Sequence, residues 1–195
     1  MSLLTVNQLQ AQDAATNIIT LSPGDSVYSP GSVVQVVETY ITTPTAVSVP
    51  ANVAGYTSIP DLSASITPKK LGSRIFVQVR WLGEWSGQTQ NWDSMFGVSR
   101  NGVSIGENPG STTAGSSRGI APSLLTYYAD DGNSTLEVCH FTVLDSPNSA
   151  ALLTYQVFVN ASAARTLFTN RVVNGAAGSN FEYGSSSITL WEISQ

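Results

Sequence analysis

Residues 74–82 read RIFVQVRWL and residues 96–106 read FGVSRNGVSIG, and these two runs decide the fold. In the first run every second side chain is apolar, namely Ile75, Val77, Val79 and Trp81. Period-two alternation rich in β-branched and aromatic residues predicts a β-strand with one buried face. Residues 83–93, which follow, are rich in Gly, Gln and Asn and are typical of a loop.

The second run contains the strongest turn signal in the chain. Asn101-Gly102 lies between two alternating segments, and a type I′ turn needs positive φ at both central residues, which Asn and Gly adopt most readily. In a two-residue hairpin Arg100 faces Val103 and Val98 faces Ile105, so Val98 and Ile105 share one face. The sequence therefore predicts antiparallel sheet at this point.

Composition favours a single ordered domain with an uncharged surface. The chain has 195 residues, of which 42% are hydrophobic and only 11% are charged. That hydrophobic content is too high for a disordered chain and sufficient for a core. A surface of neutral polar side chains is common where a protein lies against other proteins, because isolated charges would have to be desolvated.

Charge and cysteine content exclude several classes of partner. The net charge of -5 and the scattering of eight Lys and Arg residues argue against nucleic acid, since phosphate binding draws on clustered cations. Cys139 is the single cysteine, so we expect neither an intrachain disulfide nor a cysteine zinc site. No long apolar run and no signal-peptide pattern is present, so we expect no membrane insertion and a product made in a reducing cytoplasm.

The first thirty residues differ from the rest. Leu3, Leu4, Val6 and Leu9 are apolar, but the segment has too few apolar residues to form its own core. Two interpretations stay open: an extended arm that docks through these residues on a neighbouring subunit, or a first strand with a frayed terminus. We take residues 1–30 as an attachment arm and residues 31–195 as the folded domain.

The remaining sequence reads as short strands and turns. We expect about eight to ten strands and no helix, spaced as in an antiparallel β-sandwich of the jelly-roll type. Residues 107–123 are expected to form a long loop, and residues 124–130 to form a second hairpin with residues 134–145. Further strands are expected at residues 32–41, 151–161, 165–174 and 186–193.

No arrangement of residues supports catalysis or metal binding. Cys139 and His140 are neighbours on an expected strand, where adjacent side chains point to opposite faces, so they cannot form a dyad. The carboxylates show no spacing that singles out a catalytic pair. Asp130, Asp131 and Asn133 surround a glycine and fit turn chemistry better than a calcium loop. We therefore expect no enzyme activity, no catalytic residues, no metal and no cofactor.

Aromatic residues are the remaining candidates for a site. Trp85 and Trp92 flank Gln88 and Asn91 in the expected loop, whereas Trp81 is expected in the core. An indole face can cover a sugar ring while amides bond its hydroxyls, so these four residues could contact a glycan. The same residues could equally anchor a protein interface.

Several phrases resemble one known group of proteins. MSLLTVNQLQ, YSPGSVVQVVETY, LSASITPKKLGSRIFVQVRWLGE, FGVSRNGVSIG and SSITLWEIS occur in this order over most of the chain. Together they resemble small virion structural proteins of tailed bacteriophages, notably phages of aquatic and cyanobacterial hosts, labelled as tail-fibre or head-decoration proteins. The resemblance implies a compact β domain, commonly trimeric, attached to the virion through its N-terminal segment.

Three hypotheses follow. The first is a trimeric decoration or cement protein that stabilises the head by binding the major capsid protein. The second is a tail-fibre or receptor-binding protein that contacts host surface glycans through the tryptophan loop. The third, a hydrolase, has no supporting constellation.

Overall fold

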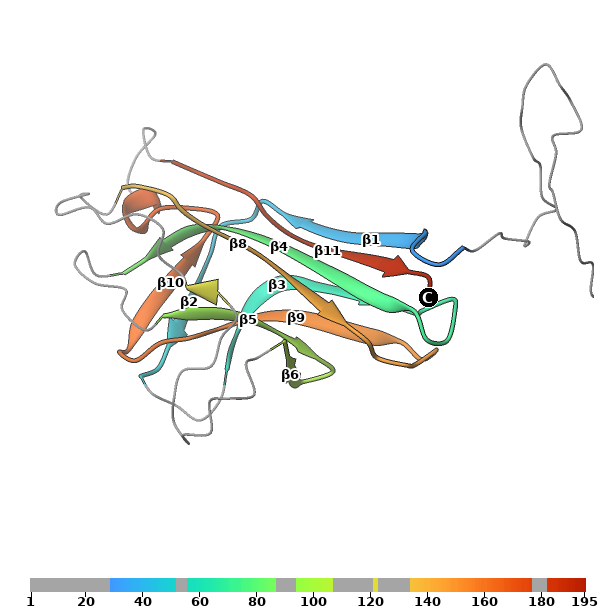
Figure 1. The fold of residues 1–195 in the computed structure, drawn as a ribbon. Coiled ribbons are helices and arrows are strands. Elements are labelled where there is room, and N and C mark those ends of the chain that lie inside the picture. Colours follow the sequence, from blue (N-terminus) through green and yellow to red (C-terminus); the bar gives the residue numbers. More distant parts are fainter. Residues whose placement is uncertain (1–28, 52–55, 87–93, 107–120, 123–133, 177–181) are drawn as a thin grey trace, which may run out of the picture.

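The computed structural model describes residues 29–51, 56–86, 94–106, 121–122, 134–176 and 182–195. Eleven strands and one short 3₁₀ helix lie within these residues (Figure 1). They are β1 (Val33–Ile41), β2 (Thr45–Val49), β3 (Thr57–Ile66), β4 (Arg74–Trp85), β5 (Met95–Arg100), β6 (Val103–Ile105), β7 (Ala121–Pro122), β8 (Glu137–Asp145), β9 (Leu153–Asn160), β10 (Arg165–Thr169), η1 (Val173–Ala176) and β11 (Ser186–Ile193). The expected second hairpin and most of the expected arm involve residues 124–130 and 1–28, which lie outside the described part.

The strands form two antiparallel sheets that pack face to face. In the first sheet β1 pairs with β11, β11 with β4, and β4 with β8. At one end of this sheet β4 also pairs with β10, and β10 pairs with β2. In the second sheet β3 pairs with β9, β9 with β5, and β5 with both β6 and β7. Counting β1–β2, β6–β7 and β10–β11 as one strand each, the orders are 1-8-3-6 and 2-7-4-5. This is the strand order of a jelly roll, so the predicted fold class is confirmed.

The core lies between the sheets and is filled by the inward side chains of both. Every second residue of β4 from Ile75 to Trp81 is fully buried, as its alternation predicts. Trp81 packs on Phe96 of the opposite sheet with ring centroids 4.8 Å apart, and Trp85 meets the same ring at 6.4 Å. Aromatic side chains of this size each contribute about 1.5–3 kcal/mol on burial.

The Asn101-Gly102 hairpin forms in the predicted register. Val98 lies opposite Ile105 and Arg100 opposite Val103, and the two turn residues have φ values of 50° and 82°. Asn101 also joins the turn to β9, because its N–H donates to the Thr154 carbonyl at 2.9 Å while its Oδ1 accepts the Thr154 N–H at 2.8 Å. The turn is thereby fixed to its neighbouring strand.

The chain enters the fold beside its last strand. The N–H of Gly31 donates to the Ser194 carbonyl at 2.8 Å, and the N–H of Ser194 donates to the Ser32 carbonyl at 2.9 Å. β1 then continues along β11 as an outer strand of the first sheet, as Figure 1 shows. Residues 1–28 therefore join the domain at the β1 margin of this sheet.

Candidate interaction surface

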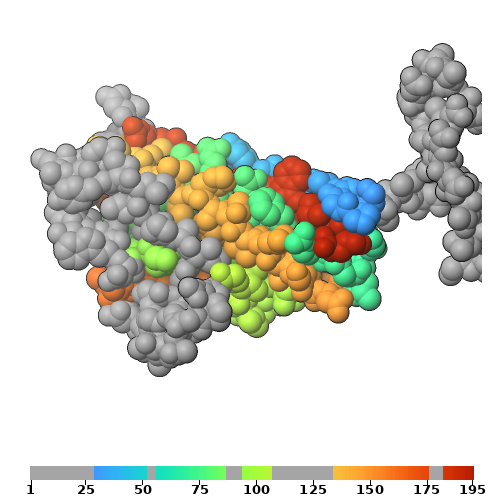
Figure 2. Space-filling view, in the orientation of Figure 1, coloured from blue at the N-terminus to red at the C-terminus, as the bar shows by residue number. Residues whose placement is uncertain are grey.

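The first sheet has an outer face, defined as the side of β1, β11, β4 and β8 that points away from the core. Side chains alternate along each strand, so the even-numbered residues of β4 and β8 and the odd-numbered residues of β11 lie on this face. Their exposure agrees, because the intervening residues Val77, Phe141 and Leu190 are buried. In Figure 2 the orange atoms of β8 and the red atoms of β11 reach the surface.

An apolar row crosses this face. Strand pairing places Val36 opposite Trp191, Trp191 opposite Phe76, and Phe76 opposite Leu144, so one apolar side chain comes from each of the four strands. Val36 and Leu144, at the two ends, are 48% and 50% exposed, while Trp191 and Phe76 are half-buried. We call these four residues the apolar row. Exposed apolar groups that are contiguous across a sheet are typical of an interaction surface.

A row with polar side chains lies beside the apolar row on the outer face. The next row consists of Glu38, Thr189, Gln78 and Thr142, and the hydroxyl of Thr189 lies 3.2 Å from a carboxylate oxygen of Glu38. Gln78 also contacts the ring of His140 at 3.1 Å. Three of the four side chains in this row are neutral, so the row costs little to desolvate.

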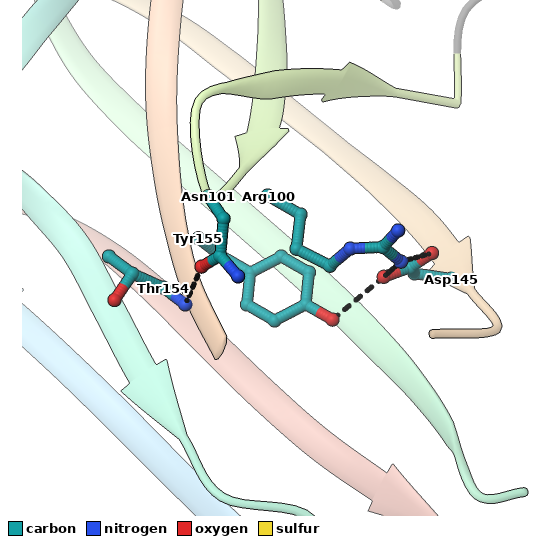
Figure 3. A network of polar contacts seen from close by, with 5 residues as sticks. All are labelled: Arg100, Asn101, Asp145, Thr154 and Tyr155. Carbon is teal, nitrogen blue, oxygen red and sulfur yellow. Dashed lines mark hydrogen bonds and ion pairs between the residues drawn. The ribbon is translucent and has the colours of Figure 1, made fainter. Parts of the chain in front are cut away.

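An ion pair joins the two sheets at the end of β8 (Figure 3). Arg100 of the second sheet donates from Nη1 to both carboxylate oxygens of Asp145 at 2.7 and 2.6 Å, and the hydroxyl of Tyr155 donates to the same carboxylate at 2.8 Å. Burial, and then the Asp145 hydrogen bond, raise the pKa of the Tyr155 hydroxyl. The hydroxyl therefore stays protonated and donates, and the network fixes the position of β8 next to Leu144.

A buried carboxylate stabilises the turn between β3 and β4. Glu192 of β11 is fully buried and accepts the backbone N–H groups of Lys69 and Lys70 at 3.0 Å and the amide of Gln35 at 2.7 Å. Burial opposes its ionisation, but these hydrogen bonds outweigh that effect and lower its pKa from the ordinary value. These hydrogen bonds tie the turn before β4 and the Gln35 side chain of β1 to β11, which is a structural role.

The structure corrects one predicted site residue. Trp85 is only 2% exposed and packs against Phe96 in the core, so its indole face is not available to a glycan or a partner. The reason is that β4 continues three residues beyond Leu82, the expected end of the strand, and Trp85 then shares the inward face of Trp81. The other predicted site residues lie outside the described part: Trp92, Gln88, Asn91, Leu3, Leu4, Val6 and Leu9.

Cys139 and His140 lie on opposite faces of β8, as the sequence predicts. Cys139 is buried, and burial raises the pKa of its thiol to about 12, whereas His140 is exposed on the outer face. The two cannot act as a nucleophile and base. Within the described ranges, no three His, Cys, Asp or Glu residues come together as a metal site requires. The same part of the chain contains no helix with the length and apolarity needed to cross a membrane.

Sequence reasoning missed the apolar row. Its four members come from strands separated by up to 155 positions, from Val36 to Trp191, and only the pairing register brings them into line. One signal was available: Trp191 is out of phase with the buried Ile188 and Leu190 in the alternation of the last strand. An outward tryptophan in such a strand indicates a surface that is not simply solvated.

Comparison with known proteins identifies no family for this chain. No protein-family model matches the sequence, and no curated protein matches it. Among solved structures, the subviral particle of infectious bursal disease virus VP2 aligns with a TM-score of 0.35 and 11% sequence identity. The alignment covers 91% of this chain and 42% of that one, so this chain spans about two fifths of the viral protein. The fold defined by the strand order is a jelly-roll β-sandwich.

Proposed function

We propose that this chain is a non-enzymatic structural protein of a virion, and that it assembles as a homotrimer that decorates and stabilises the capsid. The observation that carries the proposal is the apolar row on the outer face of the first sheet. The jelly-roll fold, the low charge content and the resemblance of the sequence to small phage virion proteins are consistent with this role.

The occupant of the outer face is a second copy of the same chain. The most exposed members of the row, Val36 and Leu144, lie at opposite margins of the four-strand array. A head-to-tail arrangement brings the Val36 margin of one copy toward the Leu144 margin of the next, and contacts of this kind form a ring when the rotation between copies closes.

The remaining contacts in this proposal are with the virion. The major capsid protein is the expected partner of a decoration trimer, and residues 1–30 are the attachment arm, which docks on a neighbouring subunit. The protein is then located in the virion after synthesis in the host cytoplasm. Neither nucleic acid nor a metal or cofactor takes part.

Immunogold labelling of intact virions with antibody to this chain tests the proposal. Label spread over the head is the expected result. Label confined to the tail tip would replace decoration by the receptor-binding alternative, and Trp92→Ala would then be tested for loss of glycan binding. Absence of label on well-preserved particles, with the epitope shown to be accessible on the purified protein, would overturn the virion role.

A further inference from the structure

The described edge strands are not equally protected against pairing with another chain. β3 contains Pro60 and a register shift beside Asp61, which has a φ of 60°, and β1 has a register shift near its start. β2 has five residues and β6 has three. Short strands, prolines and bulges are the devices that prevent edge-to-edge association. β8 has none of them: its nine residues, EVCHFTVLD, contain no Pro, Lys or Arg and pair with β4 without a shift.

Among the described strands, none pairs with the side of β8 that faces away from β4, and we call this side the open edge of β8. The backbone presents a regular set of groups there. Both the N–H and the carbonyl of Leu82 bond toward the β10–β11 side of β4, to Ser186 and Asn170 respectively. The backbone N–H and carbonyl groups of the even-numbered residues of β4 therefore point away from β8. Those of the odd-numbered residues point toward β8. By the pairing register, the odd-numbered residues of β8 bond to β4, and the even-numbered ones direct both backbone groups outward. These are Val138, His140, Thr142 and Leu144.

The side chains at this edge match a neutral apolar strand. All four of these residues are exposed on the outer face, and none is an acid or a permanently charged base. Residues 1–12, MSLLTVNQLQAQ, contain no Asp, Glu, Lys or Arg and include the apolar Leu4 and Val6 at alternate positions. An extended segment of this composition can add to an open edge, because main-chain hydrogen bonds supply affinity and alternate side chains pack on the face.

The position of the N-terminal segment favours exchange between copies. Its root at Gly31 lies on the β1 margin, and β8 is the opposite margin of the same sheet. In a head-to-tail ring the β1 margin of one copy lies next to the β8 margin of the following copy. Residues 10–28 can span up to about 60 Å when extended, which is ample for the crossing.

We infer that residues 3–9 of one copy add as a strand to the open edge of β8 in the neighbouring copy. This inference rests on the proposed self-association and deepens it, since it names the segment and the strand that join two copies. Leu4 and Val6 then lie between Leu144 of one copy and the Val36 margin of the other and continue the apolar row, and the outward backbone groups of β8 gain partners.

Hydrogen exchange resolved to single amides tests the inference on the full chain. The reference variant carries Leu4→Asp and Val6→Asp, which weaken docking of the arm and leave the jelly roll intact. We expect the amides of His140 and Thr142 to exchange at least tenfold more slowly in the native chain than in the variant. The amides of Cys139 and Phe141, which bond to β4, serve as controls and should exchange alike in both.

Mixing then identifies the donor. The isotopically labelled variant is refolded together with an excess of unlabelled native chain, or with unlabelled variant as the matched control. We expect the His140 and Thr142 amides of the labelled variant to exchange tenfold more slowly in the first mixture than in the second. Equal exchange rates in the native chain and the variant would overturn the inference. It would also be overturned if native chain failed to slow exchange at His140 and Thr142 of the labelled variant in the first mixture. The virion labelling experiment is independent, so either proposal can fail while the other stands.

Discussion

A double-mutant cycle on Tyr155 and Asp145 tests the link between the two sheets. The Tyr155 hydroxyl donates to Asp145 at 2.8 Å, and Arg100 donates to the same carboxylate at 2.6 Å. These residues come from β9, β8 and β5, so the network joins both sheets at the end where Leu144 contributes to the apolar row. The perturbations are Tyr155→Phe, Asp145→Ala and the two combined.

The magnitudes follow from burial. Tyr155→Phe removes one hydrogen bond to a charged acceptor, which contributes about 1.5–3 kcal/mol, so we expect a loss of about 2 kcal/mol. Asp145→Ala leaves the buried Tyr155 hydroxyl unpaired, which costs about 1–3 kcal/mol. It also removes the ion pair, but Arg100 is 29% exposed against 10% for Asp145, and solvent screening limits that part to about 1 kcal/mol. We expect a loss of about 3 kcal/mol in total.

Urea unfolding of the four proteins, followed by tryptophan fluorescence, measures the cycle. Because both substitutions remove the same hydrogen bond, the double variant should lose about 3 kcal/mol and not about 5, which corresponds to a coupling energy of about 2 kcal/mol. Additive losses would show that Tyr155 and Asp145 do not interact, and would refute the reasoning. Arg100→Gln, which leaves the hydroxyl bond in place, is the control and should cost about 1 kcal/mol or less.

Three further predictions concern the fold. Because folding lowers the pKa of Glu192, the ionised carboxylate stabilises the folded protein at pH values above its unfolded pKa, and this stabilisation is lost as the pH falls through its folded pKa. The free energy of unfolding, measured at pH 7 and pH 3, should therefore fall more for the native chain than for Glu192→Gln. Gly83→Ala places a Cβ 2.0 Å from the Phe168 carbonyl oxygen, so thermal melting should show about 1–3 kcal/mol of destabilisation, whereas an unchanged melting temperature would contradict the close approach. Cys139, whose pKa is raised to about 12, should react with a thiol reagent at pH 8 only after unfolding; rapid reaction of the native protein would contradict its burial.

The sequence was sufficient to predict those elements that neighbouring residues in the chain determine. The Asn101-Gly102 turn sets its own register because both residues accept positive φ, and the alternation of Ile75 to Trp81 sets the buried face of β4. The spacing of strands and turns indicated the jelly-roll class. The pairing of β1 with β11, which joins the two ends of the domain, has no local cause and required the structure.

The error at Trp85 has a physical explanation. Gly83 resembles the end of a strand, but it lies within β4, where a Cβ would overlap the Phe168 carbonyl and the Trp81 ring. The glycine therefore marks the close approach of β10 and does not end the strand. A reading that continued the alternation through Gly83 would have placed Trp85 in the core. Glu192 was missed similarly, although it is in phase with Ile188 and Leu190, and an acid in phase with core residues indicates a buried carboxylate.

Sedimentation equilibrium of the native chain beside Leu144→Asp tests the central claim, self-association through the outer face of the first sheet. Leu144 is half exposed and has no role in the core, so the variant should fold normally. Thr67→Asp, an exposed residue in the turn between β3 and β4, controls for the added charge. We predict the mass of three chains for the native protein and the control, and the mass of one chain for Leu144→Asp. A native monomer at all concentrations, or a Leu144→Asp trimer as stable as the native one, would contradict the claim.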